Sequence, residues 1–248
     1  MSTSVVIYFL LSLLLVDFIR STVQMIQVKR YFDAGYKGVR GVYRLGRGDK
    51  LTIALIGDSG IDGHHTNNIK FGPYTSIITD LSRRYSIEVH VFAVQGSKSG
   101  EVIRNQLPEI KQLKKVDLIC VYMGANNIIR GYGVTAARDD YLTVLECAEQ
   151  KGARVIASEV ADYYLLKMFS YAHRLLIYIA NKSINKKLRQ IAALHPNFVL
   201  IPIEGLTKKY FTAEHQADGL HPNDKGLRLW GDVLLEEAKN RPALKPYF

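Results

Sequence analysis

Short apolar runs alternate along most of the chain with longer stretches in which apolar residues recur at helical spacing. Five runs have the length and nearly continuous apolar character of parallel strands buried on both faces. They are Leu51–Gly57, Glu88–Val94, Asp117–Gly124, Arg154–Val160 and Phe198–Ile203. Helical spacing covers residues 74–85, 101–113, 135–151, 163–194 and 224–239. The alternation predicts an α/β fold, a three-layer α/β/α sandwich around a five-stranded parallel sheet.

Two residues mark expected helix boundaries. Gly152 directly follows the helix predicted over residues 135–151, where glycine commonly forms the C-terminal cap. Pro108 lies inside the segment 101–113, and its missing N–H is expected to bend or divide that helix.

The first part of the chain carries a different pattern. Val5–Val16 is apolar apart from Ser12, and Asp17 then interrupts the run. A run of this length is typical of an interfacial helix, but it approaches spanning length if Asp17 lies at the membrane surface. A secretory signal is less well supported, because no basic residue precedes the run and no small-residue cleavage site follows it. We predict a membrane-anchor helix over residues 1–28, with a helix packed on the domain itself as the alternative.

A basic, glycine-rich linker is predicted over residues 29–50, ahead of a catalytic domain over residues 51–248. The chain has a net charge of +10, and much of the excess lies between positions 20 and 50. A basic segment beside an apolar helix favours contact with anionic lipid head groups, and an ordinary solvated connector is the alternative. No zinc-finger or RNA-binding motif accompanies the charge, so no nucleic-acid partner is expected. The basic segment favours a cytoplasmic position for the domain.

Residues that can carry chemistry follow the predicted strands. The blocks are Gly57-Asp58-Ser59-Gly60, Gly96, Gly124-Ala125-Asn126-Asn127 and Asp218-Gly219-Leu220-His221. Each block alone is also typical of an ordinary turn or helix cap. Because the carboxyl ends of parallel strands meet at one edge of a sheet, we expect the blocks to lie together.

Together these residue types suit acyl transfer. Ser59 can serve as nucleophile, and His221 can take its proton while Asp218 orients the imidazole. The backbone N–H of Gly96 and the side-chain amide of Asn126 can stabilise an oxyanion.

The four blocks resemble those of the SGNH/GDSL hydrolase family over about residues 51–240. The resemblance implies a flavodoxin-like fold and a catalytic triad of Ser59, Asp218 and His221. It also implies an oxyanion hole formed by the Ser59 N–H, the Gly96 N–H and the Asn126 side chain. Two positions depart from the family pattern: Gly60 stands where leucine is frequent, and Asn127 stands where aspartate is usual. Gly60 is expected to loosen the packing behind the nucleophile.

The sequence therefore predicts a serine hydrolase that cleaves a carboxylic ester, with no metal or organic cofactor. The substrate is expected to be a small-molecule, lipid or glycan ester. Two alternatives remain open: an acyltransferase that acts on a sugar or glycolipid, and a non-catalytic membrane-anchored binding module.

Several other residues are expected to be structural. The remaining histidines are predicted to lie in loops or elements without catalytic partners; they are His64, His65, His90, His173, His195 and His215. Cys120, Cys147 and Trp230 are predicted to be core residues. An apolar-aromatic stretch from Tyr163 to Tyr178 fits core packing at least as well as a lipid-binding cover.

Overall fold

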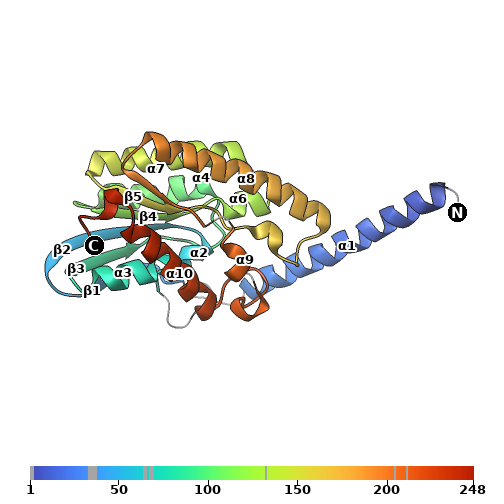
Figure 1. The fold of residues 1–248 in the computed structure, drawn as a ribbon, viewed down its shortest axis with the longest axis horizontal. Helices are drawn as coiled ribbons and strands as arrows, with labels where there is room; N and C mark the ends of the chain where they lie inside the picture. Colours follow the sequence, from blue (N-terminus) through green and yellow to red (C-terminus); the bar gives the residue numbers. More distant parts are fainter. Residues whose placement is uncertain are drawn as a thin grey trace.

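The structure is a computed structural model that describes residues 3–32, 38–63, 66, 70–131, 133–203, 205–210 and 212–248. Helices cover both faces of a central sheet (Figure 1). The strands are β1 Gly41–Leu45, β2 Asp49–Gly57, β3 Tyr85–Val91, β4 Leu118–Tyr122, β5 Arg154–Ser158 and β6 Phe198–Ile201. Their order is β1-β3-β2-β4-β5-β6, and neighbours among β2 to β6 run parallel. The predicted α/β sandwich is confirmed.

The sheet has six strands where five were predicted. The additional strand, β1, runs antiparallel to β3 at the edge of the sheet. It lies within the segment predicted as a linker over residues 29–50, of which residues 33–37 lie outside the described part. Only alternate residues of β1 are partly buried. On the exposed side, Arg44 Nη2 forms an ion pair with Glu88 Oε2 of β3 at 2.9 Å. A five-residue edge strand with one covered face has too weak an apolar pattern to be detected.

The helices match the predicted segments with two divisions. The longer ones are α1 Thr3–Phe32, α3 Thr75–Leu81, α5 Leu107–Gln112, α7 Val134–Lys151, α8 Tyr171–Leu194 and α10 Asp224–Lys239. The shorter ones are α2 Ser59–Asp62, α4 Ser99–Glu101, α6 Ala125–Ile129 and α9 Thr207–Tyr210. Short 3₁₀ turns cover Gly72–Tyr74, Tyr163–Leu165, Ala213–His215 and Pro242–Leu244.

Both divisions have local causes. The segment 101–113 contains a π-helix over Val102–Gln106, after which α5 begins with Pro108 in its first turn. The segment 163–194 is interrupted before Ser170, whose side chain accepts a hydrogen bond from His173 N–H and caps α8. Gly152 ends α7 in the left-handed conformation, as predicted.

The core lies on both faces of the sheet. Along β2, Ile53 and Leu55 face the layer of α3 and α10, while Ala54 and Ile56 face the layer of α5 and α7. All four side chains are fully buried, which explains why the strand reads as a continuous apolar run. Cys120, Cys147 and Trp230 are buried, as predicted.

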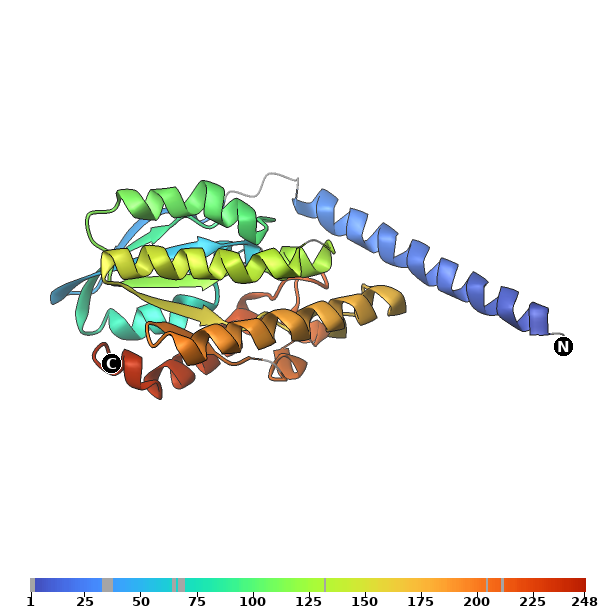
Figure 2. The ribbon, with the colours of Figure 1, turned by 90° about the horizontal axis from the view of Figure 1, so that it is seen from above.

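The long helix α1 leaves the domain and projects from it (Figures 1 and 2). Among the described residues, it is the one helix whose length and composition suit a membrane crossing, over Ser4–Gln27. Its apolar side chains are largely exposed. Helix α1 also continues four residues beyond the predicted anchor, to Phe32.

The strand order creates a crevice at one edge of the sheet. The chain passes from β2 to β3 on one side and then crosses to β4 on the other side. In open α/β sheets, ligands bind outside the carboxyl ends of two neighbouring strands whose following connections leave in opposite directions. Ser59 follows β2 and Asn126 follows β4, so two predicted site residues lie at this position.

Replacement of Gly57 by alanine should strongly destabilise the fold. Gly57 has φ +152°, and an added Cβ would lie 2.1 Å from the carbonyl oxygen of Tyr122 on β4. Gly152→Ala is a matched control, because Gly152 also has positive φ but open space around it. We expect losses of about 3 kcal/mol for Gly57→Ala and about 1 kcal/mol for Gly152→Ala in urea unfolding. Equal losses would show that the close approach of β4 does not constrain position 57.

Candidate active site

A tight turn at the end of β2 presents Ser59. Asp58 caps the short helix α2, and its Oδ1 accepts a hydrogen bond from Gly60 N–H at 2.9 Å. Ser59 is the first residue of α2 and lines a pocket at the edge of the sheet. The turn therefore places the Ser59 hydroxyl beyond the carboxyl end of β2, in the pocket.

The buried side-chain amide of Gln106 holds this turn by two hydrogen bonds to the backbone of Gly57. Gln106 Oε1 accepts a hydrogen bond from Gly57 N–H at 2.8 Å, and its Nε2 donates to Gly57 O at 2.9 Å. The same Nε2 lies 3.3 Å from Ser97 Oγ, in the turn that follows β3. Gln106 is thus a positioning residue that joins two of the site's turns. Its role could not be predicted from the sequence, since a glutamine in a helical pattern usually faces solvent.

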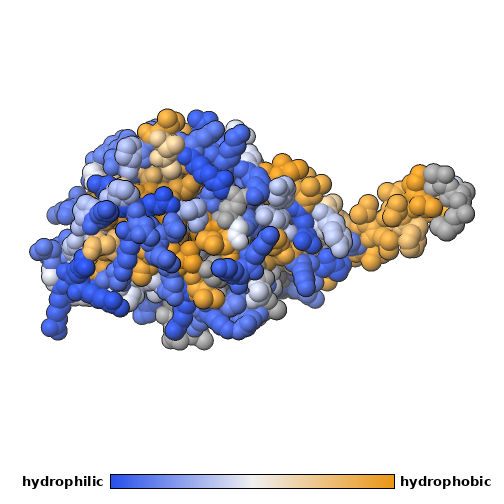
Figure 3. Space-filling model, viewed as in Figure 1, coloured by the Kyte–Doolittle hydropathy of each residue, from blue (hydrophilic) through white to orange (hydrophobic). Residues whose placement is uncertain are grey.

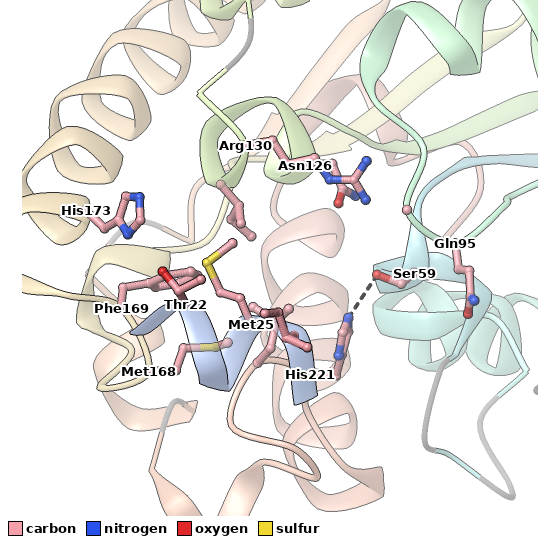
Figure 4. A pocket seen from close by; sticks show the side chains of 14 residues that line it. Thr22, Met25, Ser59, Gln95, Asn126, Arg130, Met168, Phe169, His173 and His221 are labelled. Atoms are coloured by element: carbon pink, nitrogen blue, oxygen red, sulfur yellow. Dashed lines mark hydrogen bonds between the residues drawn. The ribbon is translucent and has the colours of Figure 1, made fainter. Parts of the chain in front are cut away.

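The predicted triad residues lie within hydrogen-bonding distance of one another. Ser59 Oγ and His221 Nε2 are 3.1 Å apart, and Figure 4 marks this contact. His221 Nδ1 lies 2.8 Å from Asp218 Oδ2. The arrangement leaves Nε2 to accept the serine proton while Asp218 holds the other ring nitrogen.

Asp218 remains a carboxylate in this setting. Burial opposes its ionisation, but hydrogen bonds from His221 outweigh burial and hold the pKa of Asp218 well below its usual range. Its Oδ1 also accepts hydrogen bonds from the backbone N–H groups of Leu220, at 2.9 Å, and His221, at 2.7 Å. The carboxylate thus holds the Nδ1 side of the His221 ring, which leaves Nε2 facing Ser59.

The predicted oxyanion donors line the same pocket as the Ser59 hydroxyl. Gly96 lies in a turn with φ +73°, and it lines the pocket with Ser59 and Asn126. Within the described part of the chain, no hydrogen bond uses the backbone N–H of Ser59 or Gly96. Asn126 Nδ2 donates to Asp58 Oδ2 and to Ser97 O, each at 3.2 Å. Two backbone donors are therefore available to a ligand, and the amide is oriented beside them.

Asp58 is a buried carboxyl group under the site. Burial raises its pKa to about 7, although hydrogen bonds from Gly60 and Asn126 and the charge of Arg130 favour ionisation. In the ionised form both carboxylate oxygens accept, Oδ1 from Gly60 N–H and Oδ2 from Asn126 Nδ2, whereas a proton on Oδ2 competes with the Asn126 N–H. Its charge state therefore bears on how firmly the Asn126 amide is held.

The two departures from the family pattern are accommodated by neighbouring side chains. At Gly60, a Cβ would lie 2.7 Å from the ring of Tyr122, so that ring already occupies the space. The expected loosening behind the nucleophile is therefore not observed. Asn127 Oδ1 accepts a hydrogen bond from Ser99 N–H at 2.9 Å, and its Nδ2 donates to Ser99 Oγ at 3.0 Å. An amide at this position both donates and accepts, which a carboxylate cannot do.

The pocket in front of Ser59 has a volume of about 560 Å³ and extends well beyond the predicted residues (Figure 4). The further lining residues are Thr22, Met25, Ile26, Gln95, Ile129, Arg130, Met168, Phe169, His173 and Leu220. The lining is mostly apolar, and the exposed guanidinium of Arg130 lies beside Gly96. Three of these residues belong to α1, for which the sequence carried no signal of a role at the site.

The other histidines have varied surroundings. His173, which was predicted to lack a catalytic partner, lines the pocket, and the centre of its ring lies 5.5 Å from that of Phe18 on α1. His90 Nε2 contacts Glu88 at 2.9 Å on the same strand. His64 and His65 lie outside the described residues. No group of three or more possible metal ligands occurs among the side chains that the structure describes.

Comparisons with known proteins agree with the fold. A model of the GDSL-like lipase/acylhydrolase family matches residues 55–229, which include all four predicted blocks. No curated protein sequence is similar enough to count as a match. The resemblance predicted from the four blocks is therefore confirmed by the family model.

Several solved structures share the fold at low sequence identity. TesA is 20% identical, with a TM-score of 0.60, and the alignment covers 80% of this chain and 100% of TesA. A lipolytic G-D-S-L family protein from Veillonella parvula is 19% identical, with a TM-score of 0.59 and coverage of 75% and 97%. A catalytic mutant of an acetylxylan esterase from Geobacillus stearothermophilus is 14% identical, with a TM-score of 0.56 and coverage of 78% and 96%.

The raised pKa of Asp58 predicts a pH-dependent stability difference. The folded chain retains the Asp58 proton up to about pH 7, whereas an unfolded carboxyl releases it near its ordinary pKa of 3.8. The folded state is therefore weakened as the pH rises between these values. We expect the unfolding free energy of the wild type, relative to Asp58→Asn, to fall between about pH 4 and pH 7. Asp62, whose pKa is also raised, is present in both proteins, so the difference between the two curves reports Asp58 together with its interaction with Asp62. A difference that is constant across this range would contradict the assignment.

Proposed function

Because this chain belongs to the GDSL-like lipase/acylhydrolase family, we propose that it hydrolyses carboxylic esters through an acyl-enzyme intermediate on Ser59. The observation that carries this proposal is the hydrogen-bonded series from Ser59 Oγ through His221 to Asp218. A hydroxyl, an imidazole and a carboxylate in this order are what nucleophilic acyl transfer requires.

In the first half of the reaction, Ser59 Oγ attacks the ester carbonyl carbon. His221 Nε2 takes the serine proton and passes it to the departing alcohol, whose bond to the acyl carbon breaks. Asp218 keeps Nδ1–H bonded and stabilises the imidazolium. In the second half, His221 takes a proton from water while the water oxygen attacks the acyl carbon. The bond between the acyl carbon and Ser59 Oγ then breaks, His221 returns the proton to Oγ, and the carboxylic acid leaves.

The developing oxyanion is stabilised by three donors in this proposal. The Ser59 and Gly96 N–H groups make no hydrogen bond to the part of the chain that the structure describes, and Asn126 supplies a side-chain N–H. The Asn126 contacts to Asp58 and Ser97 are at the long end of the normal range, so one N–H can turn toward the substrate. Catalytic hydrogen bonds often tighten only when the substrate is bound.

We also propose that α1 anchors the chain in a membrane. Ser4–Gln27 is long and apolar enough to cross a bilayer, and its exposed side chains would otherwise face water. A cytoplasmic position of the catalytic domain stays a prediction from the basic segment that follows the helix.

Ser59→Ala should abolish turnover without unfolding the chain. Removal of the nucleophile is expected to lower kcat by about 10⁴-fold or more, measured with p-nitrophenyl acetate. A fluorophosphonate probe should label the wild type but not the variant. Ser76→Ala, which removes a hydroxyl bonded to Asp232 on the surface, is the matched control and should retain activity and labelling. Equal rates for Ser59→Ala and the wild type would rule out the mechanism.

Asn126→Ala should lower kcat by roughly 10²–10³-fold with a smaller change in KM, because the lost N–H acts on the oxyanion. Asn126→Asp keeps the shape of the side chain but removes the donor, so its kcat should fall as well. If both variants turn over within threefold of the wild type, Asn126 does not belong to the oxyanion hole.

A further inference from the structure

Helix α1 forms one wall of the catalytic pocket. Thr22, Met25 and Ile26 line it together with Met168 and Phe169, from the segment before α8. Figure 4 shows Met25, Met168 and Phe169 gathered on one side of the pocket, with Gln95 and Asn126 on the other. The pocket is thus apolar on the α1 side and polar beside the nucleophile. An ester with a long apolar acyl chain matches this division.

The α1 wall is held by specific contacts. Asp17 Oδ2 accepts a hydrogen bond from Tyr171 N–H at 2.8 Å, and Arg20 donates to Lys167 O at 3.0 Å. Ser21 is fully buried at the contact. Asp17, Ser21 and Met25 are spaced by four residues and so share one face of α1. The wall is therefore built into the fold, although the family match begins only at residue 55.

The docking of α1 leaves little free helix for a membrane. The first described hydrogen bond from α1 to the domain is at Asp17, and residues 3–16 of α1 extend beyond this point (Figure 2). At 1.5 Å per residue this free part is about 21 Å long, which is shorter than a hydrocarbon core of about 30 Å. A bilayer entered by α1 must therefore reach the surface of the domain around the pocket.

The first turns of α8 present an apolar surface at that place. Tyr171, Leu175 and Ile179 are spaced by four residues, and with Leu176 they are between 57% and 73% exposed. The start of α8 lies toward the side from which α1 leaves the domain (Figure 2), and apolar atoms cover this region in Figure 3. The exposed apolar residues of α8 lie close to the apolar helix α1, which indicates that a lipid bilayer contacts this surface.

Given the ester hydrolysis proposed above, we infer that the substrate is a long-chain acyl ester taken directly from the bilayer. Its acyl chain would lie between α1 and the Met168–Phe169 segment, with the carbonyl at Ser59. The exposed face of α8, formed by Tyr171, Leu175, Leu176 and Ile179, would hold the pocket mouth at the membrane.

The acyl site is tested with the full chain in phosphatidylcholine nanodiscs. Met25→Trp fills the space against α1, and it should lower kcat/KM for p-nitrophenyl laurate at least about tenfold. The loss on p-nitrophenyl acetate should be smaller, because a short acyl group makes fewer contacts with the α1 wall, so the laurate-to-acetate ratio of kcat/KM should fall. Val23→Trp adds the same bulk on the exposed side of α1 and should change neither rate.

Ile26→Trp repeats the test at a lining residue that is 47% exposed, where added bulk does not disturb a packed core. If the variants at Met25 and Ile26 hydrolyse laurate as well as Val23→Trp does, the α1 wall is not the acyl site. If the wild type hydrolyses neither ester, the proposed function itself fails. Acetate activity thus separates the two failures.

The bilayer contact is tested with the double substitution Leu175→Ser and Leu176→Ser. Loss of this apolar surface should lower the rate on laurate ester embedded in phosphatidylcholine vesicles about tenfold or more, and leave the acetate rate in buffer unchanged. Leu194→Ser is the control, because Leu194 lies at the opposite end of α8 and is 76% exposed. Equal effects of the two changes on the vesicle substrate would overturn the proposed membrane contact.

Discussion

The hydrogen bond between Ser59 Oγ and His221 Nε2, 3.1 Å long, joins positions that are 162 residues apart, and the rest of the site is arranged around it. The parallel sheet brings the serine to one edge, and the segment before α10 brings the imidazole to the same edge. Ala217 N–H donates to His221 O at 2.9 Å, and Asp218 accepts the His221 N–H. The histidine is therefore fixed by its own backbone as well as by its carboxylate partner.

Buried polar side chains link the turns that carry the site. Gln106 joins the turns after β2 and β3, while Asn126 reaches from the turn after β4 to Asp58. Asn127 ties the same turn to Ser99 at the start of α4. Buried polar groups destabilise a fold unless they are hydrogen-bonded, so these contacts also constrain one another. The three turns consequently behave as one rigid support for the nucleophile.

Helix α1 both lines the pocket and projects from the domain. Its free part projects from the domain, whereas Met25 and Ile26 face the catalytic pocket. In the proposed arrangement one helix both locates the enzyme and shapes its acyl site. Access to Ser59 is then governed by an element outside the sheet and its covering helices, which separates substrate capture from the chemistry of the triad.

From the sequence alone we predicted five of the six strands, the helices that follow them, the four blocks at the strand ends and the apolar N-terminal helix. These features are encoded locally, in apolar periodicity and in glycine-containing turns after strands. Strand β1 was not predicted because a short edge strand buries only one face and so has a weak apolar pattern. The positions of Gln106 beside Gly57 and of α1 beside the pocket could not be predicted from the sequence. Their roles depend on contacts between residues distant in sequence, such as Gln106 with Gly57 and Asp17 with Tyr171, and no local pattern specifies which distant backbone group a side chain will meet.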